Sequence, residues 1–101
     1  MKYRVLSVAA VDLADAMEFY DSQSEGLGLE FLDEFEAVVQ RILSCPHAWT
    51  SVSPNQRRAL FRRFPFAVLY SCNSTEILIT AVMDIRIEPA LQQARVKKTG
   101  Q

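Results

Sequence analysis

The stretch RRALFRRFPFAVLY, residues 57–70, changes character at its middle. Residues 57–63 place four arginines in seven positions and alternate in part with apolar residues, a pattern that predicts a strand. The run FAVLYSC at 66–72 is apolar on both of its faces, which is typical of a central strand in a covered sheet. Phe64 and Pro65 predict a tight connection between the two strands, because proline cannot donate a hydrogen bond to a neighbouring strand.

A second apolar run follows directly. EILITAVM at 76–83 has the composition of another central strand, and Asn73-Ser74-Thr75 before it has the residue types of a hairpin turn. Upstream, PHAWTSVSPNQ at 46–56 is punctuated by prolines and predicts a loop. The C-terminal half therefore predicts three antiparallel strands joined in sequence.

The N-terminal half predicts one strand and two helices. KYRVLSVA at 2–9 is rich in strand-forming residues. Asp12 then lies where it could cap a helix over 12–24. A second helix runs from Leu29 to the break at Pro46, and the short link between the helices predicts an antiparallel hairpin. The apolar stripe of the second helix consists of Phe31, Leu32, Phe35, Val38, Val39, Ile42 and Leu43.

The predicted order is β-α-α-β-β-β. It predicts an α+β fold in which the helical hairpin packs on one face of a twisted antiparallel sheet. At 101 residues the chain has the length of one domain, which we assign to residues 1–89. Residues 90–101 are predicted to be a C-terminal tail, and Pro89 could begin one short helical turn at 89–95.

Charge is distributed unevenly along the chain. The formal net charge is only −1, yet nine of the twelve acids lie between Asp12 and Glu36, and no Lys or Arg interrupts that span. The basic residues lie in the other segments. This separation predicts two surfaces that suit different partners.

Several classes of protein are excluded by composition. No apolar run approaches the roughly 18 residues of a membrane span, and the N-terminus lacks the apolar core of a signal peptide, so we expect a cytoplasmic protein. Cys45 and Cys72 form no CxxC pair, and His47 is the sole histidine, so the sequence predicts no metal site. It contains no phosphate loop or dinucleotide fingerprint, and we expect no cofactor.

The arginines are the strongest functional signal. If 57–63 is a strand, Ala59 and Phe61 face the helices, and Arg58, Leu60 and Arg62 stand on the other face. Guanidinium groups there would suit nucleic acid or an acidic protein segment. Two plainer readings stay open: a solvated edge strand that resists aggregation, and pairing of Arg86 with Asp84 or Glu88. The candidate contact residues are Arg57, Arg58, Leu60, Arg62, Arg63, Asp84 and Arg86.

The motifs of the chain resemble the RelE/ParE toxin superfamily of bacterial type II toxin–antitoxin systems. The matching segments are DLADAMEFYDSQSEGLGLEFLDEFEAVVQRI (12–42), CPHAW (45–49), RRALFRRFPFAVLY (57–70) and AVMDIRIEP (81–89). The likeness is greatest to the ParE-like, plasmid-stabilisation branch. It implies a small toxin that arrests growth unless a cognate antitoxin binds it.

The superfamily divides by mechanism. Ribonuclease members of the RelE type cut messenger RNA on the ribosome with basic residues on the sheet face. Arg58, Arg62 and Arg86 match basic positions of that pattern. Other positions depart from it: Leu60 and Ala67 replace expected basic residues, Gln92 replaces a tyrosine, and Asp84 stands where many relatives carry histidine.

These departures favour the ParE side, whose members inhibit DNA gyrase without catalysing a reaction themselves. Two alternatives remain: a ribosome-dependent mRNA endonuclease, and an attenuated member that only binds its antitoxin, for which Asp84 is the best argument. In each case the expected partner is an antitoxin within a hetero-oligomeric complex. We expect its carboxylates to contact residues 57–63 and its apolar residues to cover Leu60 and Leu69.

Overall fold

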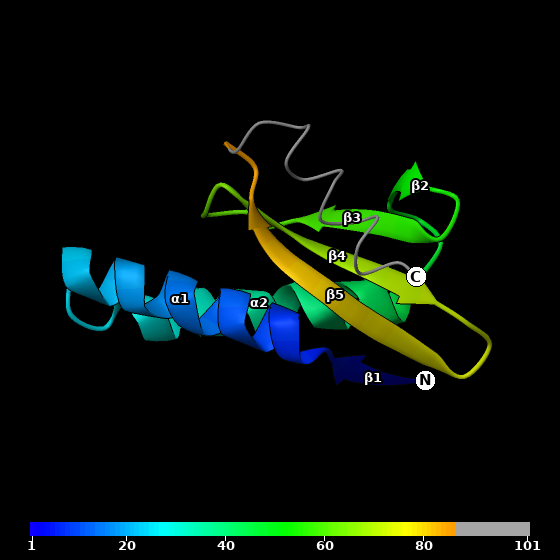
Figure 1. The fold of residues 1–101 in the computed structure, drawn as a ribbon, viewed down its shortest axis with the longest axis horizontal. Coiled ribbons are helices and arrows are strands. Elements are labelled where there is room, and N and C mark those ends of the chain that lie inside the picture. Colours follow the sequence, from blue (N-terminus) through cyan, green and yellow to red (C-terminus); the bar gives the residue numbers. More distant parts are fainter. Residues whose placement is uncertain (87–101) are drawn as a thin grey trace.

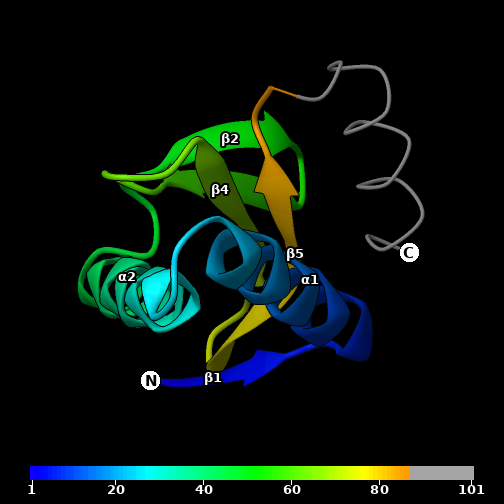
Figure 2. The ribbon, with the colours of Figure 1, turned by 90° about the vertical axis from the view of Figure 1, so that its left-hand side faces the viewer.

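The computed structural model describes residues 1–86, which form a five-stranded sheet with two helices on one side (Figures 1 and 2). In chain order the elements are β1 (Lys2–Val5), α1 (Ser7–Gln23), α2 (Leu27–Ser44), β2 (Thr50–Ser53), β3 (Gln56–Leu60), β4 (Phe66–Cys72) and β5 (Glu76–Asp84). The predicted α+β class, with the helices on one face of the sheet, is confirmed. The predictions for Glu88, Gln92, the turn at 89–95 and the tail 90–101 lie outside the described residues.

The sheet has the strand order β1-β5-β4-β3-β2. Strands β2 to β5 form an antiparallel meander, whereas β1 pairs with β5 in parallel. The expectation of a wholly antiparallel sheet was therefore wrong. A tight turn would force antiparallel pairing, but β1 is connected to the meander through two helices, and such a long crossover permits a parallel pair.

Strand β2 lies within the segment 46–56 that was predicted to be a loop, so that prediction was wrong. It pairs with β3, with Thr50 opposite Arg58 and Ser51 opposite Arg57, and a bulge follows Ser51. Its sequence TSVS has little apolar content to mark it as a strand. Its structure comes from hydrogen bonding to the neighbouring strand.

Several element boundaries also differ from expectation. The first strand ends at Val5 rather than at residue 9, and α1 begins at Ser7 rather than Asp12. Asp12 is not a cap: it lies inside α1, and its carboxylate accepts a hydrogen bond from the Val82 backbone N–H at 3.0 Å. The strand predicted over 57–63 ends at Leu60.

The two helices are joined by a tight turn and form the predicted antiparallel hairpin. Gly26 precedes α2 with φ of 86°, a left-handed conformation that favours glycine. Gly28 lies against α1: a Cβ atom there would be 2.6 Å from the Met17 carbonyl oxygen, and its N–H donates to Asp21 Oδ1 at 2.8 Å. Helix α2 therefore begins at Leu27, two residues before the predicted start.

The core lies between the helices and the sheet. The predicted stripe of α2 is confirmed, because Phe31, Val38 and Ile42 are fully buried in it. Phe31 is at the centre of an aromatic cluster, with ring centroids 4.7 Å from Phe61 and 5.0 Å from Phe64. The predicted burial of Ala59 and Phe61 is likewise confirmed, since both belong to this core. Arg62, predicted to stand on the opposite face with Arg58 and Leu60, lies beyond the end of β3 and lines a groove beside α2, so that part of the prediction was wrong.

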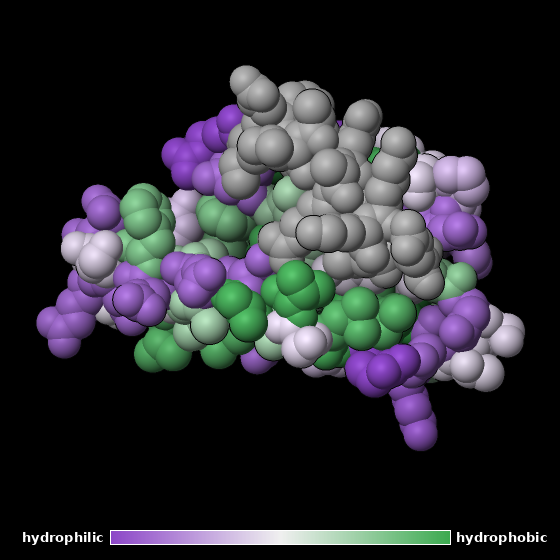
Figure 3. Space-filling view, viewed as in Figure 1, coloured by the Kyte–Doolittle hydropathy of each residue, from purple (hydrophilic) through white to green (hydrophobic). Residues whose placement is uncertain are grey.

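On the face of the molecule drawn in Figure 3, some apolar side chains are exposed among hydrophilic ones. On α1, Val11 is 58% exposed and Phe19 is 50% exposed. Within residues 1–86, neither helix combines the length and the hydropathy that a membrane span needs.

Candidate functional surface

Arg57 and Arg58 point to opposite faces of the sheet, because side chains alternate along a strand. Ala59 is fully buried beneath the helices, so Arg57 lies on the helix side and Arg58 on the outer face. The Arg57 guanidinium donates to the Trp49 carbonyl oxygen at 2.7 Å. The sheet thus separates two arginines that are neighbours in the sequence.

The outer face carries a second, smaller apolar cluster of Leu69, Ala81 and Met83. Arg58 lies opposite Leu69 in the register, and its Nε is buried with no hydrogen-bond partner within the described residues. Leu69 is only 4% exposed, whereas Leu60 on the same face is 47% exposed. Of the two leucines expected to meet an antitoxin, Leu60 is therefore the accessible one.

The C-terminal end of strand β5 lies beside the turn between β3 and β4. Phe66 is paired with Asp84, and the Ile85 N–H donates to the Pro65 carbonyl oxygen at 2.9 Å. Exposed residues from both segments consequently gather at one end of the sheet. We call this group the turn surface; it consists of Leu60, Arg62, Arg63, Ile85 and Arg86.

Glu34 of α2 fixes the β3–β4 turn. Its Oε1 accepts hydrogen bonds from the backbone N–H groups of Arg62 at 2.7 Å and Arg63 at 2.6 Å. The side chain is buried, and its Oε2 has no hydrogen-bond partner within residues 1–86. A single carboxylate therefore holds the backbone of the turn that carries both arginines.

Two arginines of the turn surface are already paired. Arg63 contacts Glu30 Oε1 at 2.7 Å and lies over the Phe64 ring, 5.6 Å from its centroid. The hydrogen bond to Glu30, reinforced by its charge, raises the pKa of Arg63. Arg62 is exposed and forms no ion pair with any residue from 1 to 86, although it lines a groove together with Glu30 and Asp33 of α2.

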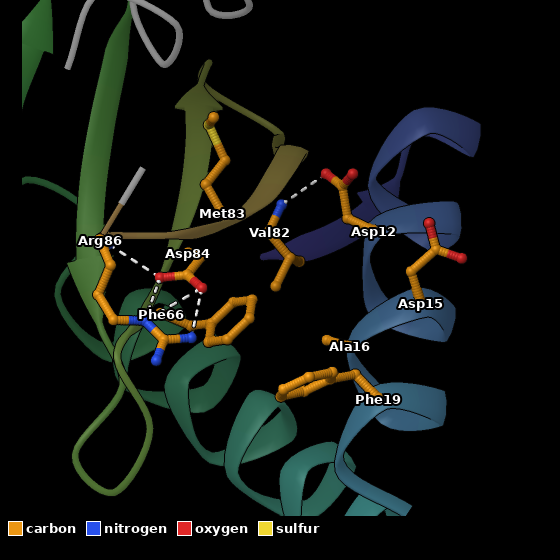
Figure 4. Close-up of a pocket in the computed structure, with 9 residues that line it drawn as sticks. All are labelled: Asp12, Asp15, Ala16, Phe19, Phe66, Val82, Met83, Asp84 and Arg86. Atoms are coloured by element: carbon orange, nitrogen blue, oxygen red, sulfur yellow. Dashed lines mark hydrogen bonds and ion pairs between the residues drawn. The ribbon is translucent and has the colours of Figure 1, made fainter. Parts of the chain in front are cut away.

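Arg86 forms a two-pronged pair with Asp84 (Figure 4). Its Nε donates to Oδ1 at 2.9 Å and its NH2 to Oδ2 at 2.6 Å. This hydrogen bonding lowers the pKa of Asp84 and raises the pKa of Arg86. The plainer reading of Arg86 as a partner of Asp84 thus describes the structure, and the charge of Arg86 is largely neutralised.

A groove of about 330 Å³ separates α1 from the end of β5 (Figure 4). Ala16 and Phe19 of α1 form one wall, and Phe66 lies opposite. Asp12 and Asp15 add carboxylates along the helix. This acidic, partly apolar groove adjoins the turn surface through Arg86.

The structure brings together most of the residues predicted from the sequence and leaves one out. Leu60, Arg62, Arg63, Asp84 and Arg86 lie at the turn end of the sheet, and Arg58 lies two residues from Leu60 on the same strand face. Arg57 lies on the other side. Ala67 is buried, so its side chain is not available for contact.

Sequence reasoning missed Glu34. Its position was a usable signal, because it lies within the stripe of α2, one turn after Phe31 and one turn before Val38. A carboxylate in such a stripe requires hydrogen-bond donors from a facing segment. Among residues 1–86, no three His, Cys, Asp or Glu side chains are grouped as metal ligands.

Comparisons with known proteins place the fold. No family model matches the sequence, and no curated protein matches it either. In structure, the chain is similar to a chain of the solved structure entitled "Chromosomal ParDE TA system from P. aeruginosa", with a TM-score of 0.73. The identity is 19%, and the match covers 83% of this chain and 95% of that chain. At this identity the likeness shows a shared fold.

Proposed function

We propose that this chain is the toxin of a type II toxin–antitoxin module, with residues 1–89 as the toxin domain and an antitoxin bound at the turn surface. The fold supports the proposal, because a structure of a ParDE toxin–antitoxin system contains a chain with the same architecture. The sequence motifs resemble the same superfamily. We further propose that the toxin inhibits DNA gyrase by binding it.

The observation that carries the proposal is the composition of the turn surface. Leu60 is 47% exposed and Ile85 is 42% exposed. Arg62, which forms no ion pair within residues 1–86, is exposed in the neighbouring β3–β4 turn. Exposed apolar side chains with arginine are typical of protein interfaces. An acidic antitoxin segment would satisfy Arg62 and cover both apolar residues.

The arrangement favours binding over catalysis. A RelE-type ribonuclease would need free guanidinium groups near the scissile phosphate. Arg86, one of the three residues that match that pattern, is instead held by both oxygens of Asp84. A carboxylate at that position would also repel a phosphodiester.

Expression of the chain alone tests the proposal. We expect growth arrest with filamentous cells and a DNA-damage response, and relief when a short acidic protein encoded directly upstream is co-expressed. Purified chain should inhibit supercoiling by gyrase. Rapid loss of translation with cleaved messages would instead establish the ribonuclease, and normal growth with retained antitoxin binding would establish the attenuated member.

The interface is tested by Leu60→Asp, with Leu29→Asp as the matched control. Both leucines are exposed, and Leu29 is on α2, outside the turn surface. We expect Leu60→Asp to weaken antitoxin binding at least tenfold, because it places a charge against acidic and apolar partner residues. Equal affinities of the two variants in a calorimetric titration would remove the turn surface from the proposal.

A further inference from the structure

A polar pocket of about 290 Å³ lies on the helix side of the sheet, near the end of α2. Arg57 and Tyr70 on the paired strands β3 and β4 contribute to it, together with His47 on the loop after α2. Asn55 in the β2–β3 turn and Ser51, which lies opposite Arg57 in the register, add to its polar lining. Of the residues from 1 to 86, nine line this pocket, and none of these nine is acidic.

Arg57 is half-buried and forms no ion pair with any acidic residue in the described part of the chain. Its one hydrogen bond within residues 1–86, to the Trp49 carbonyl oxygen, fixes the guanidinium at the pocket. Arg63 and Arg86 differ, because each is paired with a carboxylate. Partial burial of an unpaired cation costs free energy, which a bound anion would offset.

Tyr70 does not provide the missing negative charge. Its hydroxyl donates to the Pro46 carbonyl oxygen at 2.5 Å. Burial raises the pKa of Tyr70 to about 12, although the charge of Arg57 acts in the opposite direction. The tyrosine is therefore neutral near pH 7 and braces the loop that carries His47.

We propose that this pocket binds a phosphate group, held by the guanidinium of Arg57 and by hydrogen bonds from His47 and Asn55. A guanidinium fork binds two oxygens of a phosphate. The two further polar side chains suit the remaining oxygens of a tetrahedral anion, whereas a planar carboxylate has only two oxygens to offer. The pocket lies across the sheet from Arg58 and the outer face, so the proposal stands independently of the toxin assignment.

Trp49 provides the readout, because it is the only tryptophan of the chain and its carbonyl oxygen is bound by Arg57. Inorganic phosphate is titrated into the full chain while tryptophan emission is recorded, with sodium chloride keeping the ionic strength constant. We expect a saturable change with phosphate and none with acetate. Adenosine monophosphate forms a second arm: tighter binding than phosphate would identify a nucleotide as the source of the group, and equal binding would identify free phosphate.

Arg57→Gln should weaken phosphate binding at least tenfold, and Arg57→Lys should retain part of it. Arg4→Gln is the matched control, since Arg4 is exposed and paired with Glu76, and it should bind as the wild type does. If Arg57→Gln does not fold, His47→Gln and Asn55→Ala alter exposed residues and should each reduce the affinity several-fold. Acetate binding as tight as phosphate binding, no saturable change, or undiminished affinity in all these variants would overturn the proposal.

Discussion

The substitution Glu34→Gln tests whether one carboxylate holds the β3–β4 turn. In the wild type, Glu34 Oε1 accepts the N–H groups of Arg62 and Arg63 at 2.7 and 2.6 Å. Glutamine has nearly the same shape and keeps one acceptor oxygen, but it removes the negative charge that strengthens both bonds. The variant therefore isolates the contribution of charge from that of packing.

The expected loss follows from those two bonds. A hydrogen bond to a charged group contributes about 1.5–3 kcal/mol, and a neutral one about 0.5–1.5 kcal/mol. Weakening both bonds by the difference lowers the free energy of unfolding by about 2 kcal/mol. In a domain of this size, whose total stability is about 5–15 kcal/mol, the melting temperature should fall by roughly 10 °C.

The assay is urea unfolding followed by circular dichroism, with Glu36→Gln as the control. Glu36 is on the same helix and is exposed, so its substitution changes charge equally and should alter stability by less than about 0.5 kcal/mol. Hydrogen exchange should show reduced protection of the Arg62 and Arg63 amides in Glu34→Gln alone. Equal stability of the two variants, with unchanged amide protection, would refute the reasoning.

Three further predictions concern the core, the helix hairpin and one ion pair. Phe31→Ala should lower the free energy of unfolding by about 3–5 kcal/mol in urea titration, because a fully buried ring at the centre of the aromatic cluster is lost. Gly28→Ala should cost about 1–3 kcal/mol in the same assay, because its Cβ would approach the Met17 carbonyl oxygen to 2.6 Å; an unchanged midpoint would show that the helices can move apart. Asp84→Asn removes the ion pair with Arg86. In the folded wild type the pKa of Asp84 lies below its usual 3.8. The ion pair therefore stabilises the fold above pH 3.8, and this stabilisation is lost as the pH falls through the folded-state pKa. The stability difference between wild type and Asp84→Asn should therefore be largest near neutral pH and shrink below pH 3.8; a difference independent of pH would contradict this assignment.

The elements predictable from sequence were those with a long and uniform pattern. The apolar residues of helix α2 recur at helical spacing along its whole length. This spacing places them on one face of the helix, and that face is buried against the sheet. Strands β4 and β5 are continuous apolar runs, and Asn73 between them accepts the N–H groups of Thr75 and Glu76 as the turn prediction requires. In each case local pattern and tertiary burial agree.

The elements that were missed depend on contacts between distant segments. Strand β2 is short and polar, and it exists through its pairing with β3. The residues Val8-Ala9-Ala10-Val11 are continuously apolar, so they fit a strand or a buried helix equally well, and packing of Ala9 in the core selects the helix. The role of Asp12 could not be foreseen, because Val82, the donor it satisfies, lies 70 residues away.

The arginines illustrate why charge density along a sequence differs from charge density on a surface. Residues 57–63 contain four arginines, but strand alternation directs Arg57 and Arg58 to opposite faces, and Glu30 pairs with Arg63. The basic surface that an acidic partner would meet is therefore weaker than the sequence implies, and exposed apolar residues would have to supply more of the affinity. Separation by the sheet also allows the two proposed functions to be tested independently. Arg57→Gln should impair phosphate binding while leaving growth arrest intact. Leu60→Asp should weaken antitoxin binding while leaving phosphate binding intact.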